Sequence, residues 1–151
     1  MLHEKLTESD VKKIQEEIEH RKLVIRKEAL ESVKEARAHG DLSENFEYKA
    51  AKRFKNKNES RIRYLEKMIK TAVIVEDDSD NDEVGLNDTV TVFVEEDDCE
   101  ETYKIVTTIR SDTLNQMISI ESPLGKALMH KKIGDKVTIK IDESYSYDVV
   151  I

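Results

Sequence analysis

The chain has 151 residues, of which 38% are apolar, 38% are charged and only 5% are aromatic, a composition that argues against one compact globule and favours an elongated element such as a coiled coil. The net charge of −8 is divided unevenly, because residues 1–75 hold 18 Lys or Arg against 14 Asp or Glu whereas residues 76–151 hold 7 against 19. The first part can therefore approach nucleic acid, whereas the second part would be repelled by phosphate.

The single cysteine, Cys99, excludes a disulfide within the chain and fits a reducing compartment. The first residues lack an apolar signal core, and the sequence holds no run of about 18 apolar residues that could span a membrane. We therefore expect a soluble cytoplasmic protein that makes no contact with a membrane.

Residues 8–38 are expected to form one long amphipathic helix. Thr7 and Asp10 resemble a capping box in which Asp replaces the usual Glu, and Gly40 suits the position just beyond the helix, where glycine readily adopts a left-handed backbone. Apolar residues recur at spacings of three, four and seven, as on a helix with one buried face: Val11, Ile14, Ile18, Ile25, Ala29, Val33 and Ala36.

A second helix is expected from Ser43, a suitable N-cap, to about residue 75. Its apolar stripe has polar Asn58 in the register and consists of Phe46, Ala50, Phe54, Ile62, Leu65, Ile69 and Ala72. Two helices of about 30 residues joined by about four must lie antiparallel, and at 1.5 Å per residue the hairpin is about 45 Å long. The narrow stripe predicts a two-stranded coiled coil over residues 1–75, with its tip at residues 40–45.

Residues 76–84 are interpreted as an acidic linker, after which the apolar period changes to two. The alternating and β-branched runs predict strands over 89–94, 102–109, 117–121, 136–141 and 146–151. Pro123 favours the first turn of a short helix over residues 123–131. Residues 85–151 thus predict a small antiparallel β domain with one short helix, and the fold class is α+β.

The hairpin tip carries two carboxylates three residues apart, Asp41 and Glu44. The local interpretation is a turn, because Asp is common in turns and an acid in the first turn of a helix stabilises the helix dipole. The alternative is a divalent cation, since Mg²⁺ prefers oxygen ligands and often takes one or two carboxylates. Two acids are too few for a stable site in the isolated protein, so they would complete a site that a partner supplies.

Basic residues follow the tip, and Lys49, Lys52 and Arg53 cluster on one side of the second helix because they are three and four residues apart. They form either a solvated face of the coiled coil or a patch that contacts phosphates. Phe46 is expected in the hairpin core, whereas Tyr48 could be exposed.

The sequence carries no motif of a self-sufficient enzyme. Its four histidines show no metal-ligand spacing, and it has no phosphate-binding glycine loop, no dinucleotide-binding turn and no readable Ser/His/Asp arrangement. Residues 95–101 hold six acids around Cys99, which predicts an acidic hairpin loop rather than redox chemistry.

The run Ala36–Lys52, which reads ARAHGDLSENFEYKAAK, strongly resembles the tip signature of the bacterial GreA/GreB transcript cleavage factors. Arg61 and Ile62 fit the family's second helix, and residues 118–128 resemble the Ser-Pro segment of its C-terminal domain. The resemblance covers essentially the whole chain in order and spacing.

The resemblance implies an N-terminal coiled coil and a C-terminal domain with an FKBP-like fold. It implies that this domain docks on RNA polymerase near the secondary channel, in the region of Ser122 and Pro123, and that the hairpin enters the channel. There Asp41 and Glu44, beside Ser43, would help to hold the second Mg²⁺ and a water at the polymerase active centre. The polymerase would then hydrolyse the 3′ part of a backtracked transcript.

By the same resemblance, Lys52 and Arg53 stand where the family places basic residues that face the nascent RNA, and Lys49 adjoins them. The protein would act as a monomer and would stimulate the polymerase's reaction rather than catalyse one of its own. It would hold no stable metal and no cofactor of its own, and would use the Mg²⁺ of the polymerase.

Some positions depart from the family pattern, because Ser60 stands where Gly is usual and Ala29 where Pro is expected. The modest basic content favours a GreA-like over a GreB-like member, and the few aromatic residues of the second domain argue against prolyl isomerase activity. Two other functions stay open: a channel competitor that inhibits cleavage, which the intact pair Asp41 and Glu44 disfavours, and a coiled-coil interaction protein without a polymerase role, which leaves the tip motif unexplained.

Overall fold

A computed structural model describes residues 2–40 and 45–151 of the chain. They divide into two compact units, a helical one that contains Glu8–Val73 and a β-rich one that contains Lys5–Thr7 and Ile74–Ile151. The expected α+β class is thereby confirmed. In the described part of the chain, no helix is both long enough and apolar enough to cross a membrane.

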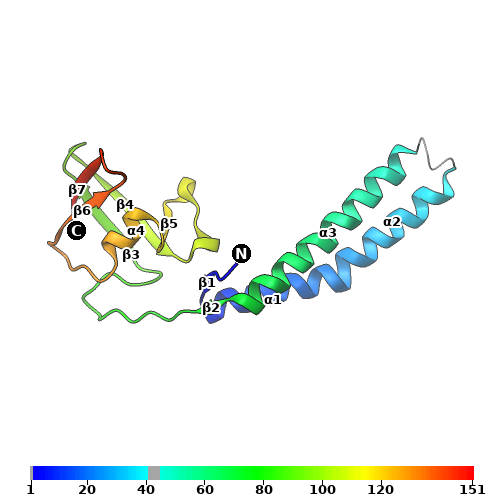
Figure 1. Cartoon of the computed structure of the whole chain (residues 1–151), viewed down its shortest axis with the longest axis horizontal. Coiled ribbons are helices and arrows are strands. Elements are labelled where there is room, and N and C mark those ends of the chain that lie inside the picture. The colour runs from blue at the N-terminus through cyan, green and yellow to red at the C-terminus, as the bar shows by residue number, and fades with distance from the viewer. Residues whose placement is uncertain (1, 41–44) are drawn as a thin grey trace. The chain divides into compact units, whose positions relative to one another are not determined.

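The helical unit is a hairpin in which two long helical arms lie side by side (Figure 1). The first arm consists of α1 (Glu8–His20), a π-helical turn η1 (Arg21–Ile25) and α2 (Arg26–Ala38), and the second arm is α3 (Phe46–Thr71). The prediction of a first helix over residues 8–38 is confirmed in its bounds, but it did not include the π-turn. The second helix ends at Thr71 rather than near residue 75, because the chain then forms β2 (Val73–Ile74), which pairs with β1 (Lys5–Leu6).

The apolar stripe of the first arm lies in the helix interface as predicted, with Ile14, Ala29 and Ala36 buried. On α3 the prediction holds for Ile62 and Leu65, which are buried, but fails for the first turns of the helix. There the side chains of Phe46 and Phe54 are 80% and 45% exposed.

Helical geometry explains this error. A step of four residues exceeds one turn of 3.6 residues by about 40°, so three successive steps of four rotate a side chain by about 120° around the axis. Asn58 is buried, and Phe54, Ala50 and Phe46 are separated from it by one, two and three such steps. Phe46 therefore points away from the interface, and Tyr48 and Ala51 are the half-buried residues at this end of α3.

The β-rich unit contains a five-stranded sheet in the order β5-β4-β3-β7-β6. Its strands are β3 (Thr89–Val94), β4 (Cys99–Val106), β5 (Met117–Ser119), β6 (Lys136–Lys140) and β7 (Ser146–Val150). Three neighbouring pairs are antiparallel, but β4 and β5 are parallel, so the prediction of a purely antiparallel sheet is wrong. The cause is the segment after β4, which contains two 3₁₀ turns (Thr108–Arg110 and Thr113–Asn115). This segment carries the chain back along β4 before β5 begins, so β5 runs in the same direction as β4.

A short helix, α4 (Pro123–Leu128), packs on this sheet, and its Leu128 joins a core formed by residues of β3, β4, β6 and β7. The core members from these strands are Val90, Val92, Val94, Ile105, Val137, Ile139 and Val149. Gly125 permits the close approach of α4, because a Cβ at this position would overlap the carbonyl oxygen of Ser119 at the end of β5.

Candidate functional site at the hairpin tip

The ends of α2 and α3 define the tip, whose predicted acids Asp41 and Glu44 lie outside the described residues together with Ser43. Gly40 follows the C-cap His39 and has φ of +121°, in agreement with the prediction that this position needs glycine. Gly40 and Asn45 are the described residues on either side of this segment.

The N-cap of α3 is Asn45 and not Ser43, which corrects the prediction. The Asn45 Oδ1 accepts a hydrogen bond of 3.0 Å from the backbone N–H of Tyr48, while its Nδ2 donates one of 2.6 Å to the carbonyl oxygen of Ala36. The amide side chain therefore caps the start of one helix and the end of the other. A second bridge joins His39 Nδ1 to Glu47 Oε2 at 2.8 Å.

The predicted basic residues Lys49, Lys52 and Arg53 all lie exposed on the first two turns of α3. The Lys49 ammonium lies 5.7 Å from the centre of the Phe46 ring, and the Lys52 ammonium lies 6.0 Å from that of Tyr48. A shallow hollow of about 510 Å³ is lined by Phe46, Lys49, Lys52, Arg53 and Asn56. The structure thus gathers the three predicted cations beside two aromatic rings.

Arg37 belongs to the same surface, although sequence reasoning gave it no role. Arg37 lies on α2, and its guanidinium carbon is 5.7 Å from the centre of the Tyr48 ring on α3. A hydrogen bond from Arg37 and the positive charge of Lys52 lower the pKa of the Tyr48 phenol. No local pattern in the sequence links Arg37 to Tyr48, which is eleven residues away, and only the pairing of α2 with α3 brings the two side chains together.

The positive charge at this end of α3 is barely balanced. Residues 45–64 contain seven Lys or Arg and only two acids, Glu47 and Glu59. Glu47 is bound by His39, and Glu59 accepts two hydrogen bonds from Arg26.

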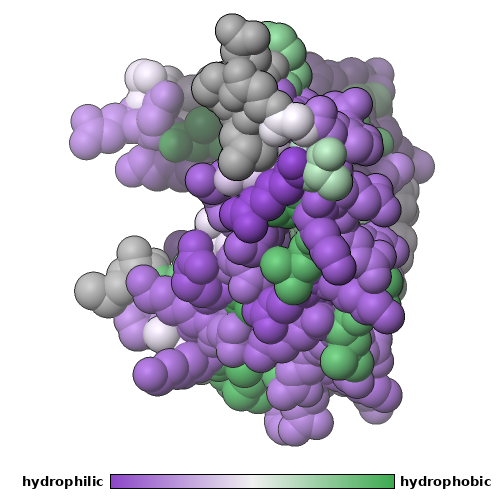
Figure 2. All heavy atoms as spheres, turned by 90° about the vertical axis from the view of Figure 1, so that its right-hand side faces the viewer, coloured by the Kyte–Doolittle hydropathy of each residue, from purple (hydrophilic) through white to green (hydrophobic). Residues whose placement is uncertain are grey.

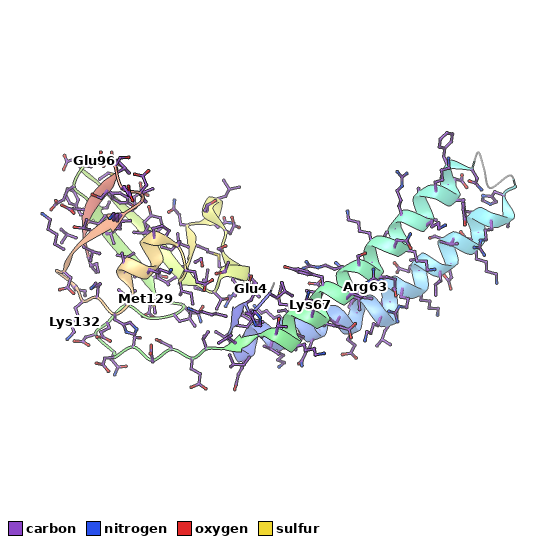
Figure 3. All side chains as sticks on the ribbon, in the orientation of Figure 1. Glu4, Arg63, Lys67, Glu96, Met129 and Lys132 are labelled. Carbon is purple, nitrogen blue, oxygen red and sulfur yellow. The ribbon has the colours of Figure 1, made fainter. Side chains whose placement is uncertain are left out.

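The surface seen from the right-hand side of Figure 1 is mainly hydrophilic with scattered hydrophobic patches (Figure 2). Further along α3, Arg63 and Lys67 are also exposed basic side chains (Figure 3).

A buried polar group marks the middle of the hairpin. Asn58 donates to the carbonyl oxygen of Arg21 (3.2 Å) and accepts from the Arg21 guanidinium (3.1 Å). The same carbonyl accepts from Arg26 N–H, the bond that closes the π-turn. Glu17 in turn accepts from Arg21 at 2.7 Å and from Arg61 at 3.1 Å. This network sets the register of the two arms and was not predicted.

In the β-rich unit, Ser122 and Pro123 begin α4 as the N-cap and the first helical residue. The Ser122 hydroxyl donates to the carbonyl oxygen of Ser119 (2.7 Å) and accepts from the N–H of Gly125 (3.0 Å), so it has a structural role. Pro123 is exposed. Their predicted part in docking stays a prediction.

Among the described residues, no group of three or more His, Cys, Asp or Glu side chains is placed to hold a metal ion.

Two family models match most of the chain. Residues 4–74 match the family described as "Transcription elongation factor, N-terminal", and residues 79–151 match "Transcription elongation factor, GreA/GreB, C-term". The chain belongs to the GreA/GreB family of transcription elongation factors.

Individual members of the GreA/GreB family are similar over most of the chain. Transcription elongation factor GreA of Caldanaerobacter subterraneus subsp. tengcongensis is 47% identical over 137 residues, which cover 90% of this chain and 87% of the relative. The GreA of Geobacillus kaustophilus is 45% identical over 136 residues, or 89% and 86% of the two chains. Among solved structures, GreA factor homolog 1 of Thermus thermophilus is 25% identical and aligns over 98% of this chain and 96% of its own, with a TM-score of 0.45.

Proposed function

We propose that this protein binds RNA polymerase, inserts its hairpin through the secondary channel and stimulates the polymerase's own cleavage of backtracked nascent RNA. One observation carries the proposal: the segment with the GreA/GreB tip signature joins the ends of α2 and α3, directly beside a cluster of exposed cations. Such a surface attracts the phosphates of RNA. Rescue of arrested elongation complexes follows from this activity.

Asp41 and Glu44, with Ser43 between them, are proposed to act at the polymerase active centre. Cleavage of a phosphodiester by two metal ions requires that the second ion be held and that the attacking water be oriented. Two carboxylates at the end of a hairpin can assist with these tasks only inside the active site of another enzyme. We propose that the polymerase completes this site and that the free protein does not hold it. The protein would then be a cofactor protein and not an enzyme.

Lys49, Lys52 and Arg53 are proposed to contact the backbone of the displaced RNA. All three are exposed, and the hollow that they line contains no acid among the described residues. The β-rich unit, whose excess of acids disfavours RNA, would instead dock on the polymerase through the start of α4, where Pro123 is exposed.

A backtracked elongation complex with end-labelled RNA tests the proposal. The wild-type protein should accelerate the release of short 3′ fragments, and Asp41→Ala should abolish this acceleration while polymerase binding is retained. Glu47→Gln is the matched control, because it removes a neighbouring exposed carboxylate that lies outside the proposed machinery.

Two outcomes would contradict the proposal. Slower cleavage with the wild-type protein would make it a competitor in the channel, and a lack of any polymerase binding would leave a coiled-coil interaction protein.

A further inference from the structure

The side chain of Phe46 lies on the surface next to the tip, although it is one of only three phenylalanines in the chain. It is the first residue of α3, and 80% of its side chain is exposed. The cap at Asn45, which is bonded to both helices, fixes the backbone that presents it. A single exposed apolar residue needs no explanation by itself, but this one stands at the first position of α3 and lines a hollow whose other members are all polar or charged.

Basic residues of the next turns of α3 line the same hollow as the Phe46 ring. Lys49 and Arg53 follow Phe46 by three and seven residues, so they lie on the same side of the helix, about 4.5 Å and 10.5 Å further along its axis. The Lys49 ammonium lies 5.7 Å from the ring centre, and the rest of the hollow is completed by Lys52 and Asn56. One aromatic face is thus followed by three positive charges.

This combination matches single-stranded nucleic acid better than it matches a protein surface. An unstacked base binds the face of an aromatic side chain, while Lys and Arg bind the phosphates that follow it. An apolar pocket on a protein would bury Phe46 but would give no reason for three cations around it. Within α3 the first two acids, Glu47 and Glu59, are bound to His39 and Arg26, and neither lines the hollow.

We propose that Phe46 is a stacking platform for one base of a single-stranded RNA whose backbone is held by Lys49, Lys52 and Arg53. This inference rests on the proposed function, because it requires that the displaced RNA 3′ segment reaches the tip. It assigns to Phe46 a positioning role for the RNA, separate from the chemistry assigned to the two acids. Because every base has a stacking face, the platform would accept any sequence.

The test uses backtracked elongation complexes and the variants Phe46→Ala, Phe46→Trp and Phe46→Leu of the full chain. Loss of one stacked base should reduce the stimulated cleavage rate roughly fivefold or more. Phe46→Trp should keep the rate, whereas Phe46→Leu, which is apolar but cannot stack, should lose as much as Phe46→Ala. Phe54→Ala is the matched control, since it removes a partly exposed phenylalanine of the same helix that does not line the tip hollow.

RNA that carries abasic nucleotides in the backtracked segment supplies the second readout. With this RNA the difference between wild type and Phe46→Ala should disappear, because neither protein has a base to stack on. A full rescue by Phe46→Leu, or a difference that persists on abasic RNA, would show that Phe46 docks on protein and would overturn the inference. Wild-type rates in Phe46→Ala would overturn it as well.

These results are distinguishable from a failure of the proposed function. If the wild-type protein does not stimulate cleavage at all, the function is wrong. If it stimulates cleavage and the Phe46 variants behave like wild type, only the stacking role is wrong.

Discussion

At the scale of single residues, the side chain of Asn45 links the two helices next to the tip. One amide group caps α3 through the N–H of Tyr48 and also satisfies the Ala36 carbonyl at the end of α2. It therefore couples the ends of the two arms on either side of the proposed catalytic acids. A small change in this side chain should alter both the stability of the hairpin and the placement of its tip.

Replacement of Asn45 tests this double role. Asn45→Ala should lower the free energy of unfolding of the hairpin by about 1–2 kcal/mol, the usual cost of a lost N-cap. Asn45→Asp keeps the acceptor for Tyr48 N–H but cannot donate to Ala36 when ionised. The stability of Asn45→Asp should therefore lie between that of wild type and that of Asn45→Ala. Urea unfolding followed by circular dichroism at 222 nm measures the difference. Equal stability of Asn45→Asp and wild type would show that the bond to Ala36 contributes nothing.

The charge of Lys52 offers a second prediction at this scale. Lys52→Glu should weaken stimulated cleavage more at low salt than at high salt, because a phosphate contact is screened by added ions. Cleavage rates of a backtracked complex over a range of salt concentrations give the comparison, with Lys67→Glu on the same helix but away from the tip as the control. An equal loss at both ends of the range would count against a phosphate contact.

At the scale of elements, the π-turn and its polar partners interrupt an otherwise regular coiled coil. The Arg21 carbonyl accepts from Arg26 and from the buried Asn58, so one side chain of α3 holds the extra residue of the opposite arm in place. A buried polar residue of this kind specifies register at some expense of apolar contact. Sequence reasoning noticed Asn58 in the apolar stripe, but its partner lies 37 positions earlier, and no local pattern links the two.

The acids of this hairpin make its stability depend on pH. Burial alone would raise the pKa of Glu17, but hydrogen bonds from Arg61 and Arg21 outweigh burial and lower the pKa from its ordinary value of 4.5. A hydrogen bond from Arg26 likewise lowers the pKa of Glu59. A carboxyl whose pKa is lower in the folded state stabilises the fold above its unfolded pKa, and this stabilisation is lost as the pH falls through the folded value.

We therefore expect the wild-type hairpin to lose stability as the pH drops below about 4.5. Glu17→Gln should be less stable than wild type at neutral pH, and the gap should close in acid, where Glu17 itself is protonated. Urea unfolding at a series of pH values measures this gap, and Glu19→Gln, an exposed position of α1, is the control. A gap that stays constant from pH 7 to pH 3 would show that Glu17 acts through packing and not through its charge.

At the scale of the whole molecule, the fold was predictable wherever a pattern is local. The bounds of the first arm, the strand Thr89–Val94 and the start of α4 at Pro123 follow from periodicity and from turn chemistry, and the structure agrees. The exposed position of Phe46, the parallel pairing of β5 with β4 and the role of Arg37 depend on which elements face each other. These features required the tertiary structure, and two of the three concern the candidate site.

The division into two units gives the last prediction, which concerns Gly125. Any larger residue there would force α4 away from the Ser119 carbonyl, so Gly125→Ala should destabilise the β-rich unit and leave the hairpin helical. Three of the five tyrosines, Tyr103, Tyr145 and Tyr147, lie in that unit, so a large part of the tyrosine fluorescence should show an earlier unfolding transition, whereas the helical signal at 222 nm should be retained. Lys126→Ala, at the exposed next position of α4, is the control. If docking belongs to this unit, Gly125→Ala should also weaken polymerase binding with an intact hairpin, and undiminished binding would assign docking to the hairpin alone.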